Sequence, residues 1–347
     1  MVQTVTITER QALDAAVAIL TARDVPADDA ETTARALVAA DLRGIDSHGL
    51  ACLSDYADAL AELRFNPRPE LKITHRVPWA SSIDGDNGLG PVAADLAMRL
   101  ALEAADAFGI GAASVKNSNH YGAAGVYALR AAERGCIGLA SANAFAITAP
   151  FGARAPFFGT NPLAAAVPAG KYPPFLLDMA TSAGALRKIR KALAEGTPIP
   201  EGWALDADGH PTTDPARAVN GMLLPFGGAK GSGLAMLLDI LTGGLSGGLF
   251  SIDVLNSFTN RYRPAANCHV FLVLRIDAFT DYDGFIRRME EMISRLTALP
   301  PAPGFDAVGY PGERSAATLA RRRAAGIPLS RVVYDRLVEL GAGLPQV

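Results

Sequence analysis

The strongest evidence for a class of fold lies in the segment Gly109-Ile110-Gly111-Ala112-Ala113-Ser114-Val115-Lys116-Asn117-Ser118-Asn119-His120-Tyr121-Gly122. Its apolar run, residues 110–115, lies between glycine and polar residues, which predicts a short strand. A helix is predicted just beyond it, over residues 123–134. The two leading glycines match the start of a dinucleotide-binding Gly-x-Gly-x-x-Gly, but Ser114 holds the third position and the pair precedes the strand. The segment therefore argues against the familiar nucleotide-binding folds.

The rest of the chain predicts a mixed α/β arrangement. Four further apolar runs bounded by Gly, Pro or Asn predict strands over 137–142, 164–167, 175–178 and 270–276. They are not separated by regular crossover helices, as a doubly wound parallel sheet would require. Helices are predicted over 28–42, 53–63, 91–108, 182–194, 230–245 and 282–299, with a turn-rich excursion over 198–215 and two helices in the tail.

The composition argues against several classes of partner. With 19% charged residues and a net charge of −3, the chain has neither a basic footprint for nucleic acid nor a polybasic patch for a membrane surface. Its apolar stretches end well short of a membrane span, and residues 1–11 lack the apolar core of a signal peptide. Cys52, Cys136 and Cys268 are far apart and have no metal-ligand spacing, so we expect a cytoplasmic protein without a metal site.

Two of the five histidines, His48 and His120, lie in short polar clusters flanked by glycine. Histidine is the usual proton donor or acceptor near neutral pH, and the Asp, Ser and Asn neighbours of these two could orient an imidazole ring. The alternative is a pair of hydrogen-bonded core or loop histidines. A nucleophilic serine at Ser47 is a weaker hypothesis, because sequence neighbours need not align hydroxyl and imidazole and no Gly-x-Ser-x-Gly is present.

Two glycine-bearing loops could bind a ligand. In Gly227-Gly228-Ala229-Lys230-Gly231, one lysine lies just before a predicted helix, and exposed amides plus an ammonium suit a phosphate. Asp178 ends an apolar strand and is followed by Thr181 and Ser182, which is typical of a ligand loop at the end of a strand. Taken alone, the lysine loop is better explained as a flexible turn, and the alternative for the Asp178 loop is an ordinary helix cap.

Eight motifs in order along the chain resemble the malate/L-lactate dehydrogenase family of non-Rossmann NAD(P)-dependent oxidoreductases. They are Asp41-Leu42-Arg43-Gly44-Ile45-Asp46-Ser47-His48-Gly49, Asp84-Gly85-Asp86-Asn87-Gly88-Leu89-Gly90, Asn117-Ser118-Asn119-His120-Tyr121-Gly122-Ala123-Ala124-Gly125, Gly159-Thr160-Asn161-Pro162, Leu177-Asp178-Met179-Ala180-Thr181-Ser182, Pro200-Glu201-Gly202-Trp203-Ala204-Leu205-Asp206, Gly228-Ala229-Lys230-Gly231-Ser232-Gly233 and Pro311-Gly312-Glu313. One such motif is weak evidence, but eight in register are strong evidence, and the missing Gly-x-Gly-x-x-Gly agrees with this family.

The resemblance implies an α/β fold with a mixed, largely antiparallel sheet flanked by helices, and a homodimer that uses NADH or NADPH on a small-molecule substrate. It divides the chain into an amino-terminal helical, substrate-side region (1–108), an NAD(P)-binding mixed α/β region (109–280) and a carboxy-terminal helical region packing back on the core (281–347). It implies that His48 and His120 are catalytic, handling the proton that accompanies hydride transfer. Substrate-binding residues are expected to be Ser47, Cys52, Thr160 and Asn161, and cofactor-binding residues Asn143, Asp178, Met179, Ala180, Thr181, Ser182, Lys230, Pro311, Gly312 and Glu313.

One position departs from the family pattern. Four residues after the first histidine, relatives carry an arginine that holds a substrate carboxylate, whereas this chain has Cys52; Asp55 stands where a second basic residue often follows. A thiol cannot make the two-pronged charged contact of a guanidinium. Either another cation replaces it, with Arg43, Lys116 and Arg154 as candidates, or the substrate lacks the usual 2-oxo acid head.

We therefore predict an NAD(P)H-dependent reductase acting on C=O or C=N of a specialised 2-oxo acid, ketone or cyclic imine. Two alternatives are an ordinary malate- or lactate-like dehydrogenase and a binding or scaffold protein that retains the fold without turnover.

Overall fold

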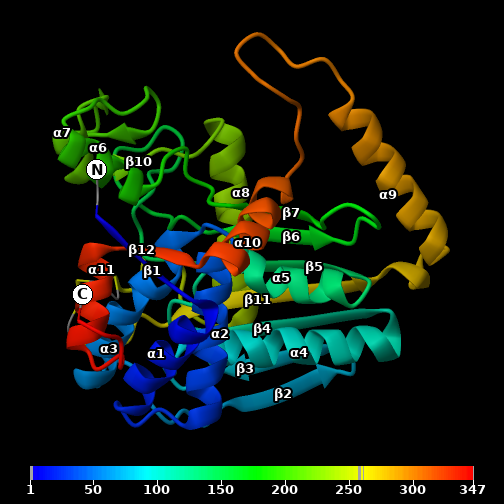
Figure 1. The fold of residues 1–347 in the computed structure, drawn as a ribbon, viewed down its shortest axis with the longest axis horizontal. Helices are drawn as coiled ribbons and strands as arrows, with labels where there is room; N and C mark the ends of the chain where they lie inside the picture. The colour runs from blue at the N-terminus through cyan, green and yellow to red at the C-terminus, as the bar shows by residue number, and fades with distance from the viewer. Residues whose placement is uncertain (1–2, 257–258, 261, 347) are drawn as a thin grey trace.

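The computed structural model describes residues 3–256, 259–260 and 262–346. Its centre is a seven-stranded sheet with the order β2-β3-β4-β11-β5-β6-β7 (Figure 1). Neighbouring strands are antiparallel except for the parallel pair β3 and β4, so the predicted mixed, largely antiparallel sheet is confirmed. The strands are β2 (Lys72–Val77), β3 (Ala80–Asp84), β4 (Ile110–Ser118), β5 (Cys136–Ala142), β6 (Leu163–Val167), β7 (Phe175–Met179) and β11 (Asn267–Arg275).

Helices α4 (Gly90–Phe108) and α5 (Ala124–Glu133) cover one face of this sheet (Figure 1). Their buried faces are rich in alanine, which lets helix and sheet backbones approach closely. Gly111 shows how close they come: a Cβ there would lie 1.8 Å from the carbonyl oxygen of Ala101. Gly111, the second glycine of the partial Gly-x-Gly-x-x-Gly match, therefore permits close packing of the helix on the sheet.

The two ends of the chain meet in a second layer. Strand β1 (Thr4–Ile7) pairs antiparallel with β12 (Ile327–Ser330), and the helices beside them share one apolar core. Sequence analysis predicted helices in the tail but missed β12, because four residues are too few to show a strand period. The predicted division at residues 108 and 280 stays a prediction. The helices named here are α1 (Glu9–Thr21), α2 (Ala27–Leu42), α3 (Leu53–Ala61), α10 (Glu313–Ala325) and α11 (Arg331–Glu339), and the short 3-10 turns between α2 and α3 are η1 (Asp46–His48) and η2 (Leu50–Cys52).

A small lobe follows β7. It contains the three-stranded sheet β10-β8-β9 and two helices, and of these elements only β8 and β9 lie wholly within the stretch predicted as a turn-rich excursion, residues 198–215. Ile189 anchors the first helix in this lobe and is fully buried. That helix begins at Leu186, later than the predicted start at residue 182. The reason is that the Ser182 hydroxyl donates to the Gly184 carbonyl and the Ala183 amide donates to the Leu224 carbonyl of the lobe. The elements are α6 (Leu186–Glu195), β8 (Ala204–Leu205), β9 (Pro211–Thr212), α7 (Pro215–Val219) and β10 (Met222–Leu223).

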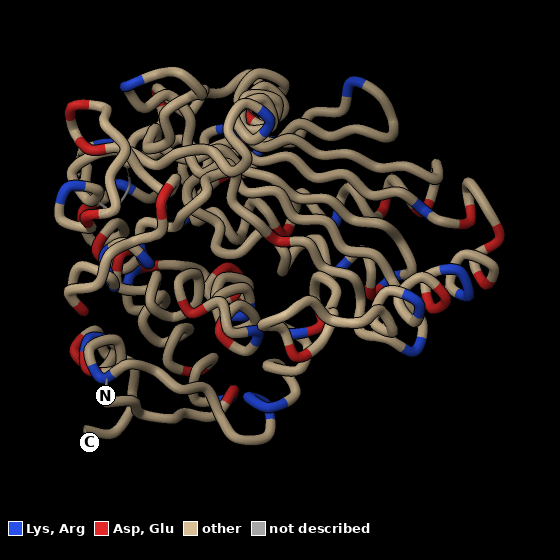
Figure 2. The backbone as a smooth tube through the Cα atoms, turned by 90° about the horizontal axis from the view of Figure 1, so that it is seen from above, with Lys and Arg blue, Asp and Glu red and all other residues tan. Residues whose placement is uncertain are grey.

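The remaining elements lie around the sheet. The helix predicted over 230–245 is α8 (Ala229–Asp239), which continues into a π-helical turn, η3 (Ile240–Gly244), and α9 (Tyr282–Thr297) follows η4 (Ile276–Ala278) after the sheet. Charges of both signs are interspersed along the outer helices, whereas the central strands carry few of them (Figure 2). Among the described residues, no helix is both long and apolar enough to cross a membrane.

Candidate active site

The loop that carries His48 is held by a buried carboxyl group. Asp41, near the end of α2, accepts a hydrogen bond from the Leu50 amide at 2.8 Å and is almost fully buried. Gly49 is required here, since a Cβ would lie 1.9 Å from Asp41 Oδ1. From the other end of the chain, Arg322 on α10 contacts the Asp41 carbonyl and pairs with Asp46. The His48 turn is therefore fixed between α2 and α10.

Ser47 and His48 interact directly within this turn. Ser47 Oγ lies 2.7 Å from His48 Nδ1. The expectation that sequence neighbours would not align hydroxyl and imidazole is therefore wrong at this site: the 3-10 turn η1 folds one side chain back onto the other.

His120 follows the end of β4 and is oriented by Tyr56 on α3. Tyr56 Oη lies 2.8 Å from His120 Nδ1 and 2.9 Å from the His120 backbone oxygen. Because a carbonyl can only accept, both contacts are satisfied when Tyr56 donates to the carbonyl and accepts from Nδ1–H. Nδ1 of His120 is therefore engaged by Tyr56. Sequence analysis missed Tyr56, although it lies only four residues after Cys52, in the first turn of α3.

The structure brings the two predicted histidines together. Their ring centroids are 5.4 Å apart with the planes tilted by 31°, and both side chains are half-buried. Burial, and then the charge of Arg187, lowers the pKa of His48 to about 4. Burial, then the neighbouring His48, Arg187 and His269, lowers the pKa of His120 to about 3. Near neutral pH both imidazoles are therefore neutral and can accept a proton.

A third histidine, His269 at the start of β11, lies behind this pair. It is fully buried and stacks on Tyr121, with centroids 4.5 Å apart and planes within 5°. Burial lowers the pKa of His269 to about 3. Sequence analysis missed this residue because a single histidine in an apolar strand looks like part of the core. The available signal was its polar neighbour Asn267, whose amide bonds the Asn143 carbonyl beside the site.

The predicted cofactor segments gather around β7. Asp178 Oδ2, near the end of this strand, accepts the Gly125 amide of α5 at 3.0 Å, and burial raises the pKa of Asp178 to about 6. The Thr181 amide and hydroxyl both donate to the Thr160 carbonyl, at 2.8 and 2.9 Å. Met179 and Ala180 lie between these two residues and are half-buried.

Two further predicted segments adjoin the same strand. The Pro311 carbonyl accepts the Leu176 amide at 2.9 Å, which places the Pro311-Gly312-Glu313 turn along β7. Ser182 forms a bridge with Pro225, and the loop after Pro225 leads to Gly228 and exposed Lys230 at the start of α8. Four segments distant in sequence therefore converge on one strand.

The two predicted asparagines are engaged internally. Asn143 donates to the Leu249 carbonyl at 2.7 Å and accepts the Cys268 amide at 2.8 Å. Asn161 donates to the Ala235 carbonyl and accepts from Ala144 and from Ser251. Both are almost fully buried and join the sheet to the loop after η3. Direct contacts from these side chains to substrate or cofactor stay a prediction.

Comparison with known proteins identifies the family. A model of the malate/L-lactate dehydrogenase family matches residues 7–338. The malate dehydrogenase of Pyrococcus abyssi is 42% identical over 332 residues, 93% of this chain and 91% of the relative. Among solved structures, the sulfolactate dehydrogenase of Methanocaldococcus jannaschii has a TM-score of 0.92 at 35% identity and 98% coverage of both chains. The Δ1-piperideine-2-carboxylate reductase of Pseudomonas syringae pvar. tomato has a TM-score of 0.88 at 30% identity, over 97% of this chain and 100% of that one.

The chain belongs to the malate/L-lactate dehydrogenase family. It is an NAD(P)-dependent oxidoreductase of small 2-hydroxy or 2-oxo acids and related substrates, as predicted, and the alternative of a scaffold protein is not supported. Among the described residues, no group of three or more His, Cys, Asp or Glu could hold a metal ion.

The residues around β7 suit the nicotinamide cofactor of this family. The first amides of α8 have no carbonyl one turn earlier in the helix, and Gly228 caps them with a positive φ of 64°. Together with the Lys230 ammonium they form a donor set that suits a pyrophosphate. These donors and Asp178 would hold the cofactor along the β7 edge of the sheet.

The substrate side of this dehydrogenase departs from the family at Cys52. The thiol is almost fully buried, donates to the Ser47 carbonyl at 3.3 Å, and burial raises its pKa to about 12. It therefore carries no charge at neutral pH. The three cations suggested as replacements are placed otherwise: Arg43 interacts with Glu133 and Arg323, Lys116 lies 4.0 Å from Asp84, and Arg154 packs against Gly209.

Proposed function

We propose that this dehydrogenase interconverts a small acid bearing C=O or C=N next to its carboxylate with the corresponding 2-hydroxy or 2-amino acid, and that His120 exchanges the proton. The observation that carries the proposal is the pair of imidazoles 5.4 Å apart, one of them held by Tyr56 so that Nε2 is its proton-exchanging atom. This geometry suits one substrate atom that gains or loses a proton while the adjacent carbon gains or loses hydride.

The low pKa values of the pair favour the oxidative direction of the reaction. In oxidation, neutral His120 accepts the hydroxyl proton of the substrate. In reduction, His120 must first take up a proton, because a pKa of about 3 keeps its ring neutral near neutral pH, and the imidazolium then gives this proton to the nascent oxygen or nitrogen. A bound nicotinamide cofactor supplies or accepts the hydride. His48, whose Nδ1 contacts Ser47, is the second polar ring next to the reacting atoms.

The proposal is tested by following nicotinamide absorbance with NADH and with NADPH against a panel of acids. The panel contains oxaloacetate, pyruvate, 3-sulfopyruvate and Δ1-piperideine-2-carboxylate. Turnover of at least one of these, with cofactor binding seen by fluorescence, supports the proposal. Cofactor binding without turnover of any 2-oxo or cyclic imino acid contradicts it. The same panel tests the sequence-based prediction that Cys52 disfavours malate and lactate.

We further infer that the working unit is a homodimer. Large apolar side chains are exposed along α8, η3 and the loop that follows, an arrangement that monomers rarely present to water. A second copy covering this strip fits the dimer implied by the family resemblance. A monomeric mass in solution for both the wild type and Leu245→Glu would contradict this; a dimer that Leu245→Glu dissociates would support it. The strip comprises Met236, Leu237, Ile240, Leu245, Leu249, Phe250 and Ile252.

A further inference from the structure

A groove between helices lies apart from the two histidines. It has a volume of about 470 Å³, which is within the size range of small-molecule sites, and residues of α1, α2, α4, α5 and α10 line it. Figure 1 shows α2, α5 and α10 next to one another. Among the described residues, the lining includes neither the histidines and their direct contacts nor any part of β7 or of the apolar strip on α8 and η3. The groove is therefore a separate candidate site.

The lining of the groove carries one more guanidinium group than carboxylate groups. Arg323 pairs with Glu9 at 3.5 Å, and Arg130 pairs with Asp95. Arg35 pairs with Glu31, a residue outside the lining. The charged residues of the lining are Arg35, Arg43, Arg130 and Arg323 against Glu9, Asp95 and Glu133.

Arg43 is the cation of the groove that has no ion-pair partner. It follows the last residue of α2, and its side chain is half-buried. Within the described part of the chain it forms no hydrogen bond or ion pair, and Glu133, the acidic group that faces it, lies beyond ion-pair distance. Guanidinium groups that are withdrawn from water normally have a partner, because burial without one costs free energy. Its donors are therefore available to an anion that enters the groove.

The rest of the lining is largely apolar. Tyr127 adds an aromatic ring, and its hydroxyl is already engaged, because it donates to the Tyr121 carbonyl at 2.5 Å. A ligand that fills the groove therefore needs a hydrocarbon body in addition to a negatively charged group. The large aliphatic side chains of the lining are Leu13, Val38, Leu42, Val126, Leu129 and Leu319.

We propose that this groove binds an organic carboxylate with an apolar body, with the carboxylate on Arg43 and the hydrocarbon part against the leucines of α1, α5 and α10. A guanidinium can hold a carboxylate by two parallel hydrogen bonds. Burial of the hydrocarbon part supplies the remaining affinity. The site is distinct from the one that holds the histidines, and the inference does not depend on the proposed function.

The test uses octanoate, titrated by calorimetry into the full-length protein in the presence of NADH. Wild type should bind octanoate, and the affinity should fall about three- to fourfold for each methylene removed in going to hexanoate and butanoate. Acetate has the charge without the body, and octanol has the body without the charge. Each should bind at least about tenfold more weakly than octanoate.

Three variants locate the bound octanoate. Arg43→Gln should weaken octanoate binding by roughly 10- to 100-fold and leave octanol binding unchanged, which also shows that the groove is still folded. Ala39→Phe, one turn before Arg43 in the lining, keeps every charge but fills the groove and should weaken the binding of both ligands. Arg321→Gln, on α10 but outside the lining, is the matched control and should bind octanoate within about twofold of wild type.

Three results would overturn the inference. One is equal octanoate affinity of Arg43→Gln and wild type, and another is a wild type that does not bind octanoate at millimolar concentration. The third is loss of octanoate binding in His120→Asn, because this would place the probe at the histidines. We expect His120→Asn to bind octanoate as wild type does, since His120 is not part of the lining.

Discussion

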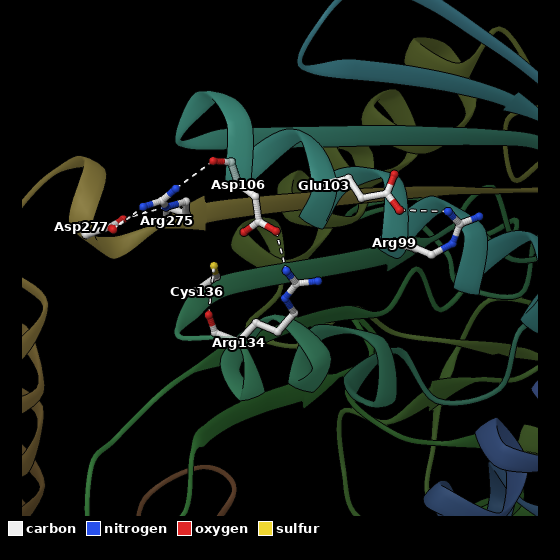
Figure 3. A network of polar contacts seen from close by, with 7 residues as sticks. All are labelled: Arg99, Glu103, Asp106, Arg134, Cys136, Arg275 and Asp277. Atoms are coloured by element: carbon white, nitrogen blue, oxygen red, sulfur yellow. Dashed lines mark hydrogen bonds and ion pairs between the residues drawn. The ribbon is translucent and has the colours of Figure 1, made fainter.

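Strand β11 connects two polar regions with opposite properties: one is exposed and its charges are paired, and the other is buried and mostly neutral. At its end, Arg275 pairs with Asp277 and donates to the Asp106 carbonyl, while Arg134 pairs with the Asp106 carboxylate at 2.5 Å (Figure 3). These groups lie at the surface and satisfy one another. At its start, His269 is buried beneath Tyr121 and close to His48 and His120, the proposed catalytic pair, among groups that are mostly neutral.

The difference shows which of the two regions has polar groups that can bind a ligand. In the exposed region each charge already has an opposite partner and water screens the rest, so little is left for a ligand. In the buried region, Ser47 contacts Nδ1 of His48 and Tyr56 contacts Nδ1 of His120. Burial shifts pKa values there at a cost in stability, as is usual for functional sites.

The largest expected effect comes from the catalytic pair. His120→Asn should lower kcat/KM by roughly 10²- to 10⁴-fold, because Asn can hydrogen bond but cannot exchange a proton. Cofactor binding, measured by nicotinamide fluorescence, should stay within about twofold, since the cofactor segments lie around β7. His48→Asn should have a smaller effect if His48 only lines the site.

The matched control is His75→Asn on the exposed strand β2, where His75 Nδ1 lies 3.1 Å from the Ser81 hydroxyl. It should retain full activity. Equal activity of His120→Asn and wild type would show that His120 does not handle the proton, and an inactive His48→Asn beside an active His120→Asn would exchange the roles of the two rings.

A second effect concerns stability at the buried region. Burial raises the pKa of Asp41 to about 7, above its value in the unfolded chain. The folded protein therefore binds this proton more tightly, and its stability falls as pH rises from about 4 to 7. Asp41→Asn keeps an acceptor for the Leu50 amide without the charge. As pH rises from about 4 to 7, the free energy of unfolding of Asp41→Asn should increase by roughly 1–3 kcal/mol relative to that of wild type. Urea unfolding at both pH values measures this difference.

A pH-independent difference between Asp41→Asn and wild type would show that the Asp41 carboxyl is not neutralised by burial. The kcat/KM of Asp41→Asn is a second measurement, because the Asp41 side chain also holds the turn that carries His48. The surface ion pairs of Figure 3 provide the contrast: no variant there should change stability with this pH dependence.

A third and smaller effect tests the electrostatics beside the histidines. Asp55 is partly buried one turn beyond Cys52, and its charge would oppose a substrate carboxylate bound beside the histidines. Asp55→Asn should therefore strengthen the binding of oxamate, a small acid with a carboxylate next to a carbonyl, by about two- to fivefold, as expected for removal of one partly screened like charge. Asp58→Asn, one turn away and paired with Arg336 at 2.9 Å, is the control and should leave oxamate affinity unchanged. Weaker binding by Asp55→Asn would contradict a repulsive role of Asp55.

These comparisons also explain what the sequence could predict. The histidine pair and the β7 segments could be found because each occupies a short polar motif flanked by glycine, where backbone geometry and chemistry are both restricted. Gly49 and Gly111 illustrate this, since each allows an approach that a Cβ would prevent. The mixed, largely antiparallel sheet followed from the family resemblance, whereas the short apolar runs alone predicted several of its strands.

The sequence could not single out His269. It sits in an apolar strand whose partners are far away in sequence. Its position depends on long-range contacts, which periodicity and motif spacing do not contain.

The smallest expected effect belongs to the exposed end of β11. Arg134→Gln removes the pair with Asp106, in which both side chains are about half exposed. It should cost less than about 1 kcal/mol of unfolding free energy and leave kcat/KM unchanged, because water replaces the lost partner. The backbone contact of Arg134 with the Cys136 thiol does not involve the side chain and should persist. Urea unfolding at low and high salt measures the cost, which should vanish as salt screens the pair. A loss of activity in this variant would mean that β11 couples its surface end to the histidine site, and the two regions would then not be independent.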